Sequence, residues 1–215
     1  MTARSRDDLD ATDHAAPLTR RGALKAGAAG LAALLTLSHI TPALAEELTR
    51  LAHHQPMTGA RLASILQAER TRWNTLLAHV GLERMDVPGV EGEWSVKEVV
   101  AHLTWYEQSI VEGAQQALRT GTFTRRRPAG VGLDEMNAQI AAASRAQPAS
   151  DVLAEADAVF GRLLSVIAAC PQDILNDPRR LGLPEDMVPW MGVANNSYAH
   201  YRQHETAVRA WLARG

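Results

Sequence analysis

Cysteine is almost absent from this sequence: Cys170 is the single cysteine among 215 residues, which excludes an intramolecular disulfide. It lies beside Pro171 at the end of an apolar stretch, so we expect buried filler rather than a reactive thiol. Aromatic residues make up only 5% of the chain and β-branched runs are few, a composition that favours helix over strand. We therefore expect an all-α protein whose stability does not depend on an oxidising compartment.

A strong charge of either sign is also missing. The 22 Lys and Arg residues nearly balance the 24 Asp and Glu residues, which leaves a formal net charge of −2 at pH 7. A protein that attracts nucleic acid through its overall charge has a much more basic balance. The composition therefore predicts no nucleic-acid partner.

The main apolar run near the start of the chain is shorter than the ~20 residues that a membrane-spanning helix needs. This run, residues 26–40, follows Arg20 and Arg21 and precedes Ala43-Leu44-Ala45. Paired arginines, a short apolar centre and an Ala-x-Ala cleavage site are the ordered parts of a twin-arginine export leader. We predict such a leader over residues 1–45, a linker over 46–57 and a folded domain over 58–215.

The leader predicts a periplasmic or extracellular protein that meets the membrane only during export. The alternative is a disordered tail, or a start assigned too far upstream, because Met57 stands where the folded part is expected to begin. In that case the protein is cytoplasmic.

The folded part predicts four long helices. The second is the best marked, since Ser95 and Glu98 fit a capping box and the apolar stripe continues to about Gly121. Apolar residues at helical spacing predict the other three over about residues 58–81, 150–170 and 193–212.

Two connections between these helices are long. The connection before the third helix holds a short amphipathic piece with Leu133, Met136 and Ile140. The connection before the last helix contains prolines and charged residues, which are typical of a loop. We therefore expect a four-helix bundle with a long loop before the last helix.

Two histidines, His200 and His204, lie one turn apart on the last predicted helix, on the stripe that carries Val208 and Trp211. Such a pair points inward and can hold one metal ion if another element completes the site. His102, at the edge of the apolar stripe of the second helix, can face the same core. Hydrogen-bonded core histidines are the alternative for these positions.

Two segments carry a resemblance to known proteins. Residues 87–107 contain Trp94-Ser95-Val96-Lys97-Glu98 before His102, and the last helix contains Asn196-Ser197-Tyr198-Ala199-His200-Tyr201-Arg202-Gln203-His204. These segments resemble the DinB-like four-helix bundles, and more narrowly the branch that includes the DfsB and colibactin self-resistance proteins. That branch has Asn-Thr-Tyr-x-His-Tyr-x-x-His in its last helix, and Ser197 replaces the usual threonine. The likeness spans about residues 58–212.

The resemblance implies a metal site. In DinB-like proteins at large, a histidine on the second helix and a histidine pair on the last bind one divalent ion, and these positions match His102, His200 and His204. We expect zinc, nickel or a similar ion. Three imidazoles leave open positions for a substrate, as a catalytic site requires.

Three further residues are expected to line a substrate pocket beside the ion. Tyr106 lies one turn beyond His102, and Asn196 lies about one turn before His200. Trp190 stands where the similar proteins tend to keep a tryptophan. The alternatives are a packed core aromatic for Tyr106 and a helix cap for Asn196.

Two functions follow from this reading. The first is an exported, metal-dependent enzyme that acts on or detoxifies a reactive small molecule by hydrolysis or thiol transfer, as the resemblance implies. The second is a non-catalytic protein that binds and sequesters a small-molecule toxin, in the manner of self-resistance. Trp105 points away from the stripe of Tyr106 by the helical period, and it is a candidate for a homodimer surface.

Overall fold

The computed structural model describes residues 56–124 and 130–214. The predicted leader, with Arg20, Arg21, Ala43 and Ala45, lies outside the described residues. Met57, at the end of the predicted linker, is fully buried in the core. The side chain of Asn176 accepts a hydrogen bond from the backbone nitrogen of Met57 (2.7 Å) and donates one to the carbonyl oxygen of Met57 (2.8 Å). The packed part of the chain therefore includes Met57.

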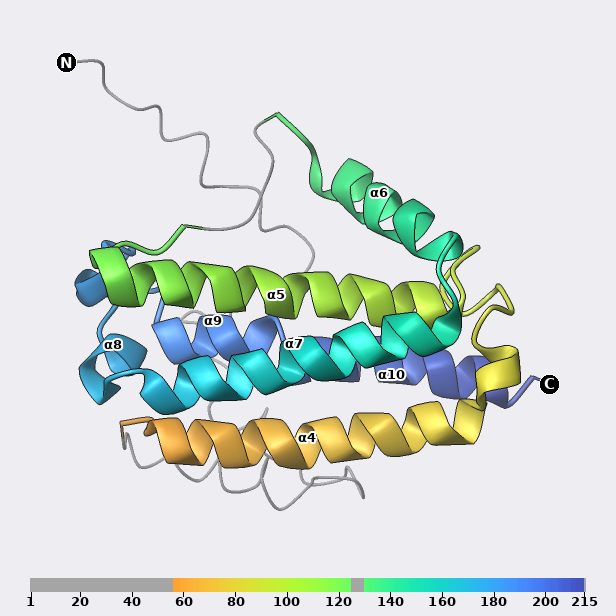
Figure 1. The fold of residues 1–215 in the computed structure, drawn as a ribbon, viewed down its shortest axis with the longest axis horizontal. Coiled ribbons are helices and arrows are strands. Elements are labelled where there is room, and N and C mark those ends of the chain that lie inside the picture. The colour runs from red at the N-terminus through yellow and green to blue at the C-terminus, as the bar shows by residue number, and fades with distance from the viewer. Residues whose placement is uncertain (1–55, 125–129, 215) are drawn as a thin grey trace, which may run out of the picture. The chain divides into compact units, whose positions relative to one another are not determined.

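Four long helices form a bundle. They are α4 (Gly59–Val80), α5 (Val96–Thr120), α7 (Ala149–Ala169) and α10 (Tyr198–Leu212). Helix α4 contacts α7 and α10, and α5 contacts the same two helices, so the four close a ring (Figure 1). The predicted all-α, four-helix bundle is confirmed.

The core lies inside this ring, and each of the four helices contributes to it. Its fully buried side chains include Leu62, Ile65, Leu66, Val99, Val159, Leu163 and Val208. Within the described ranges there is no strand, and Glu91 and Trp94 form an isolated antiparallel bridge. None of the helices in these ranges is long and apolar enough to cross a membrane.

The helix ends follow the signals in the sequence. Thr58 caps α4, because its side chain accepts a hydrogen bond from the backbone nitrogen of Arg61 (3.2 Å). Ser95 and Glu98 form a complete capping box at the start of α5. Gly121 ends α5 in the left-handed conformation, with φ of 71°.

The amphipathic piece after α5 is the helix α6 (Leu133–Arg145), which packs against α5. Lys97 of α5 donates hydrogen bonds to the carbonyl oxygens of Arg145 (3.2 Å) and Gln147 (2.9 Å). These carbonyl groups belong to the end of α6, where no further turn of helix can satisfy them. The buried lysine therefore ties α6 to the start of α5.

The long connection before the last helix is more ordered than the loop predicted from its prolines. It contains α8 (Gln172–Asn176), the 3-10 helix η3 (Pro178–Leu181) and α9 (Pro189–Asn195). Pro178 and Pro189 stand at the first positions of their helices. A backbone N–H group at this position has no acceptor within the helix, so proline, which lacks the group, breaks no hydrogen bond there. Proline here starts helices, so the prediction of a helix-free loop was wrong.

The predicted last helix is broken in two. Helix α9 ends at Asn195 and α10 begins at Tyr198. At the break, the side chains of Asn196 and Ser197 donate to the carbonyl oxygens of Gly192 (2.7 Å) and Val193 (2.6 Å). Such side-chain bonds offer backbone carbonyl groups an alternative to the helical pattern. The histidine pair therefore lies on α10 alone.

A cluster of polar side chains crosses the core, with one member from each long helix. We call Arg70, Glu107, Asp157 and Tyr201 the polar cluster. Arg70 donates to the Tyr201 hydroxyl (3.1 Å) and to Asp157 (3.0 Å), and lies 3.7 Å from Glu107. Burial raises the pKa of Glu107 to about 7, although Arg70 and Tyr201 act in the opposite direction.

Candidate metal centre

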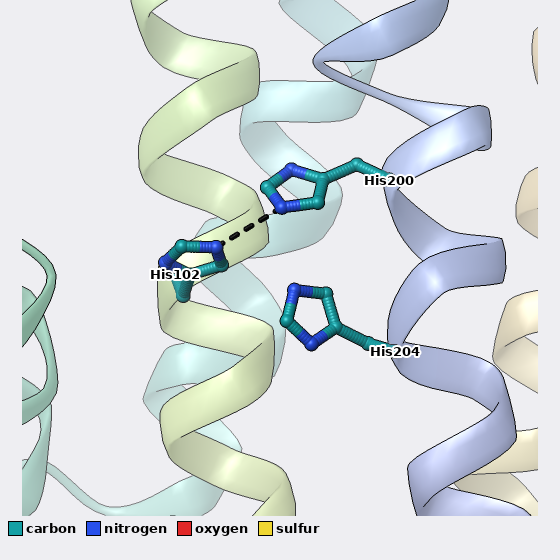
Figure 2. A group of neighbouring side chains, drawn as sticks. All are labelled: His102, His200 and His204. Carbon is teal, nitrogen blue, oxygen red and sulfur yellow. Dashed lines mark hydrogen bonds between the residues drawn. The ribbon is translucent and has the colours of Figure 1, made fainter. Parts of the chain in front are cut away.

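Two helices bring the three predicted histidines together. His102 lies in the first half of α5, and His200 and His204 lie one turn apart on α10. Figure 2 shows the three rings facing one another in the space between the helices. One nitrogen of each ring lies within 4.8 Å of the corresponding nitrogens of the other two. The expected convergence of these side chains is therefore present in the structure.

The rings are in close contact. The Nε2 atoms of His102 and His200 lie 3.1 Å apart, within hydrogen-bonding distance. The ring centres of His204 lie 5.1 Å from His102 and 4.9 Å from His200. His102 and His204 are 5% and 9% exposed, and His200 is partly buried.

Burial keeps two of these imidazoles neutral. It lowers the pKa of His102 to about 3, and repulsion from His204 adds to this effect. It lowers the pKa of His200 to about 2, and repulsion from His102 and His204 adds to it. At pH 7 both rings therefore keep a lone pair for a ligand bond.

Glu91 contacts the third histidine. Its carboxylate lies 2.7 Å from Nδ1 of His204, and the side chain of Glu91 is 33% exposed. Figure 2 shows the other nitrogen of His204 facing His102 and His200. By contrast, the Nδ1 atoms of His102 and His200 are buried without a hydrogen-bond partner among the described residues. The three histidines therefore differ in their outer contacts.

The donor set fits a divalent ion. Nitrogen ligands at 2.0–2.1 Å from tetrahedral zinc stand about 3.3 Å apart. The 3.1 Å separation of the His102 and His200 nitrogens is close to this value, and His204 is within reach. Three imidazoles with no protein carboxylate among them are a donor set that suits zinc, nickel or copper better than magnesium or calcium.

Aromatic rings surround His102. The ring centre of Tyr106 lies 4.8 Å from His102 and 4.9 Å from His200, and its hydroxyl donates to Asn137 (3.2 Å). Trp94 lies 5.3 Å from His102. Tyr106 therefore lies beside the histidines, as expected for a pocket residue.

The other two predicted pocket residues have different surroundings. Trp190 is 5% exposed and belongs to the hydrophobic core. Asn196 donates its amide hydrogen bond back to Gly192, at the end of α9. This contact resembles the alternative role of a helix cap. The helix that Asn196 caps is α9, however, and not α10, which carries the histidine pair.

Three other residues have surroundings that bear on their roles. Glu205 is 8% exposed and accepts hydrogen bonds from Arg72 (2.8 Å) and Arg209 (2.7 Å). Cys170 is only partly buried, and burial raises the pKa of its thiol to about 11. Trp105 lies 5.2 Å from the Tyr106 ring in an edge-on arrangement.

Sequence reasoning missed Glu91 and Glu107. Glu91 belongs to a turn between two helices, where no periodicity marks a side chain that points inward. Glu107 follows His102 by five residues and lies on the buried side of α5. Carboxylates are rarely buried without a partner, so the sequence alone gives no reason to expect one there.

A cavity of about 290 Å³ lies between α4 and α7 beside the polar cluster. None of the three histidines lines it.

Several solved structures have the same fold. An uncharacterised protein from Escherichia coli UTI89 is 16% identical, with a TM-score of 0.61 over 75% of this chain and 96% of that one. The Sibling Lethal Factor Precursor DfsB is 12% identical, with a TM-score of 0.63 over 74% and 98%. The colibactin self-resistance protein ClbS is also 12% identical, with a TM-score of 0.60 over 72% and 95%.

The structure of ClbS is a complex with double-stranded DNA. That complex is at odds with the prediction, made from the charge balance of the present chain, that there is no nucleic-acid partner; for this chain it stays a prediction. No curated protein matches this sequence. The family profile of the DinB superfamily matches residues 65–205, the part of the chain that contains α5, the first half of α10 and all three histidines. The chain therefore belongs to the DinB superfamily.

Proposed function

We propose that this protein is an exported, metal-dependent member of the DinB superfamily that detoxifies a reactive small molecule. The observation that carries the proposal is the convergence of three largely buried imidazoles from α5 and α10 on one point. Buried histidines without a ligand usually satisfy their ring nitrogens with protein partners. Here one nitrogen of each ring faces the other two rings, within 4.8 Å, which favours a shared ligand.

His102, His200 and His204 would hold the ion. When bound, a divalent ion supplies Lewis acidity and open coordination positions for an electrophilic substrate. Tyr106 contacts two of the ligand rings and presents its hydroxyl to Asn137, so it can orient a substrate at the edge of the site. Trp94 also contacts His102, with ring centres 5.3 Å apart, and can help to exclude water from that ring. Hydrolysis and thiol transfer are the reaction classes that we propose.

Metal content tests the proposal directly. Protein purified without an affinity tag is expected to contain about one divalent ion per chain. His200→Ala is expected to lose the ion and to retain its helical circular dichroism. His79→Ala is the matched control, because His79 lies exposed on α4. A wild-type protein that acquires no stoichiometric zinc or nickel would contradict metal dependence.

Sequestration without catalysis is the second candidate. The direct contact between the Nε2 atoms of His102 and His200 favours it, because one ring can donate to the other and hold the pair together without an ion. One of the similar proteins, ClbS, is named for self-resistance to colibactin, and this supports a role in resistance to a toxic compound.

Turnover separates the two candidates. p-Nitrophenyl acetate serves as the probe of hydrolysis, and 1-chloro-2,4-dinitrobenzene with glutathione serves as the probe of thiol transfer. An enzyme is expected to lose its rate with EDTA and to regain it with Zn²⁺. A sequestering protein is expected to retain one equivalent of ligand, to release no product and to ignore the chelator.

Export is tested separately from the site. The double substitution of Arg20→Lys and Arg21→Lys is expected to hold the protein in the cytoplasm, whereas the parent is exported. Cleavage after Ala45 would leave a mature chain that begins at Glu46, which N-terminal sequencing detects. If the parent and the variant are both cytoplasmic, the leader is misassigned.

A further inference from the structure

We propose that Glu91 is a positioning residue for the metal centre: it fixes the Nδ1–H tautomer of His204 and so presents the Nε2 lone pair to the ion. This inference rests on the proposed metal dependence and adds a carboxylate to a site that was expected to consist of three histidines. Glu91 touches a ligand and not the ion, so it acts through His204.

The first observation is the contact itself. The carboxylate of Glu91 lies 2.7 Å from Nδ1 of His204, a short distance for this kind of bond. A carboxylate accepts and does not donate, so the ring nitrogen that faces it is the one that carries hydrogen. The second ring nitrogen then has a free lone pair, and in Figure 2 it faces His102 and His200.

The second observation is that His204 differs from its two neighbours. The Nδ1 atoms of His102 and His200 are buried and have no partner among the described residues. Histidine ligands in metal sites almost always donate their other ring hydrogen to a carboxylate, a carbonyl group or water. Among the three histidines, only His204 has a protein group from the described residues in that role.

The third observation is that the turn carrying Glu91 is firmly held. Glu91 and Trp94 bridge through a backbone hydrogen bond (3.0 Å), and Val90 donates to the carbonyl oxygen of Trp94 (2.8 Å). Arg214, near the end of the chain, donates to the carbonyl oxygen of Gly89 (2.8 Å). The carboxylate is therefore placed against His204 by backbone contacts on both sides of the turn.

The same turn reaches a second ligand. The ring of Trp94 lies 5.3 Å from His102, while Glu91 contacts His204. One short segment thus contacts one ligand on α5 and one on α10. A segment that served only to connect α4 with α5 would not need either contact.

Zinc affinity and the ring tautomer test the inference in the full chain without an affinity tag. Glu91→Ala is expected to weaken Zn²⁺ binding by about 10- to 100-fold, measured by competition with a chelator. Glu91→Gln keeps an acceptor without the charge, so its loss is expected to be smaller. Glu93→Ala is the matched control, because Glu93 lies exposed two residues away, and it is expected to bind Zn²⁺ as the parent does.

Long-range ¹H–¹⁵N NMR of the metal-free protein reads the tautomer, with His204→Ala used to assign the signal. The parent and Glu93→Ala are expected to hold His204 as Nδ1–H, and Glu91→Ala is expected to shift it toward Nε2–H. Unchanged affinity and an unchanged tautomer in Glu91→Ala would overturn the inference. If the parent binds no Zn²⁺, the proposed metal dependence fails, while the tautomer measurement still decides whether Glu91 fixes His204.

Discussion

Tyr201 donates its hydroxyl hydrogen bond to the carboxylate of Glu107 at a place in the bundle where both side chains are almost completely buried. Tyr201 follows His200 in the sequence, but it points in another direction, about 100° further round α10. Its ring stacks on Trp73, with ring centres 5.7 Å apart. One helix thus serves the histidines with one face and the polar cluster with another. The two groups of residues can be tested independently.

The first prediction concerns the pH dependence of stability. The folded pKa of Glu107 is about 7 against an ordinary value of 4.5, because burial disfavours the charged form. Below pH 4.5 the carboxyl group is protonated in both states. As pH rises to 7 the unfolded chain releases the proton and the folded chain retains it, so the free energy of unfolding falls by about 3 kcal/mol.

Glu107→Gln is expected to remove this fall. Urea unfolding in EDTA between pH 4.5 and 8 measures it as the difference between the parent and the variant. Glu185→Gln, at an exposed position, is the control and is expected to follow the parent. Parallel curves for the parent and Glu107→Gln would show that the carboxyl group is already ionised in the folded protein near pH 5.

The second prediction concerns stabilisation by metal. An ion that binds only the folded chain raises the free energy of unfolding by about 2.7 kcal/mol at one hundred times its dissociation constant. Zn²⁺ is therefore expected to raise the melting temperature of the parent and of His79→Ala. His204→Ala is expected to show no comparable shift, and an equal shift in all three proteins would indicate binding elsewhere.

The third prediction concerns the cap of α5. Ser95→Ala removes the hydroxyl group that accepts from the backbone nitrogen of Glu98 at 3.3 Å. The expected loss is about 1 kcal/mol of unfolding free energy, measured by urea denaturation. Ser165→Ala, at an exposed position in the last third of α7, is the control and is expected to change stability by less than half as much.

The fourth prediction compares two glycines. A Cβ atom at Gly59 would lie 2.8 Å from the carbonyl oxygen of Ile167, where α4 approaches the end of α7. A Cβ atom at Gly161 would meet no atom within 4 Å. Gly161→Ala is therefore expected to raise the free energy of unfolding by about 0.5–1 kcal/mol, because alanine favours helix.

Gly59→Ala is expected to lower the unfolding free energy, because a backbone oxygen cannot rotate out of the way as a side chain can. Thermal or urea unfolding of both variants gives the comparison. Stabilisation by both substitutions would mean that α4 and α7 can separate at this point at little cost.

Much of the fold could be predicted from local patterns. The capping box of Ser95 and Glu98 and the stop at Gly121 depend on neighbours within four residues, so the sequence alone defines the ends of α5. The inward direction of His200 and His204 follows from helical periodicity for the same reason. These features need no knowledge of the rest of the chain.

The features that could not be predicted depend on distant partners. Proline is common both in loops and at the first position of a helix, so Pro178 and Pro189 fit either structure locally. Packing against the rest of the chain decides in favour of helix starts. Glu91 meets His204 across 113 residues of sequence, through a turn that has no periodic pattern. Asn196 and Ser197 break the last helix through bonds that compete closely with helix continuation.

The segment between α4 and α5 belongs in part to the core, since Met85 and Val90 are buried there, and in part to the surroundings of the histidines. The carboxylate of Glu91 contacts the ring of His204, and the indole of Trp94 contacts the ring of His102. Exchange of Glu91 alone, in evolution or by engineering, would change how tightly the proposed ion is bound while the buried side chains of the segment stay in place. At this one position, the strength of the proposed ion binding and the stability of the fold can therefore vary separately.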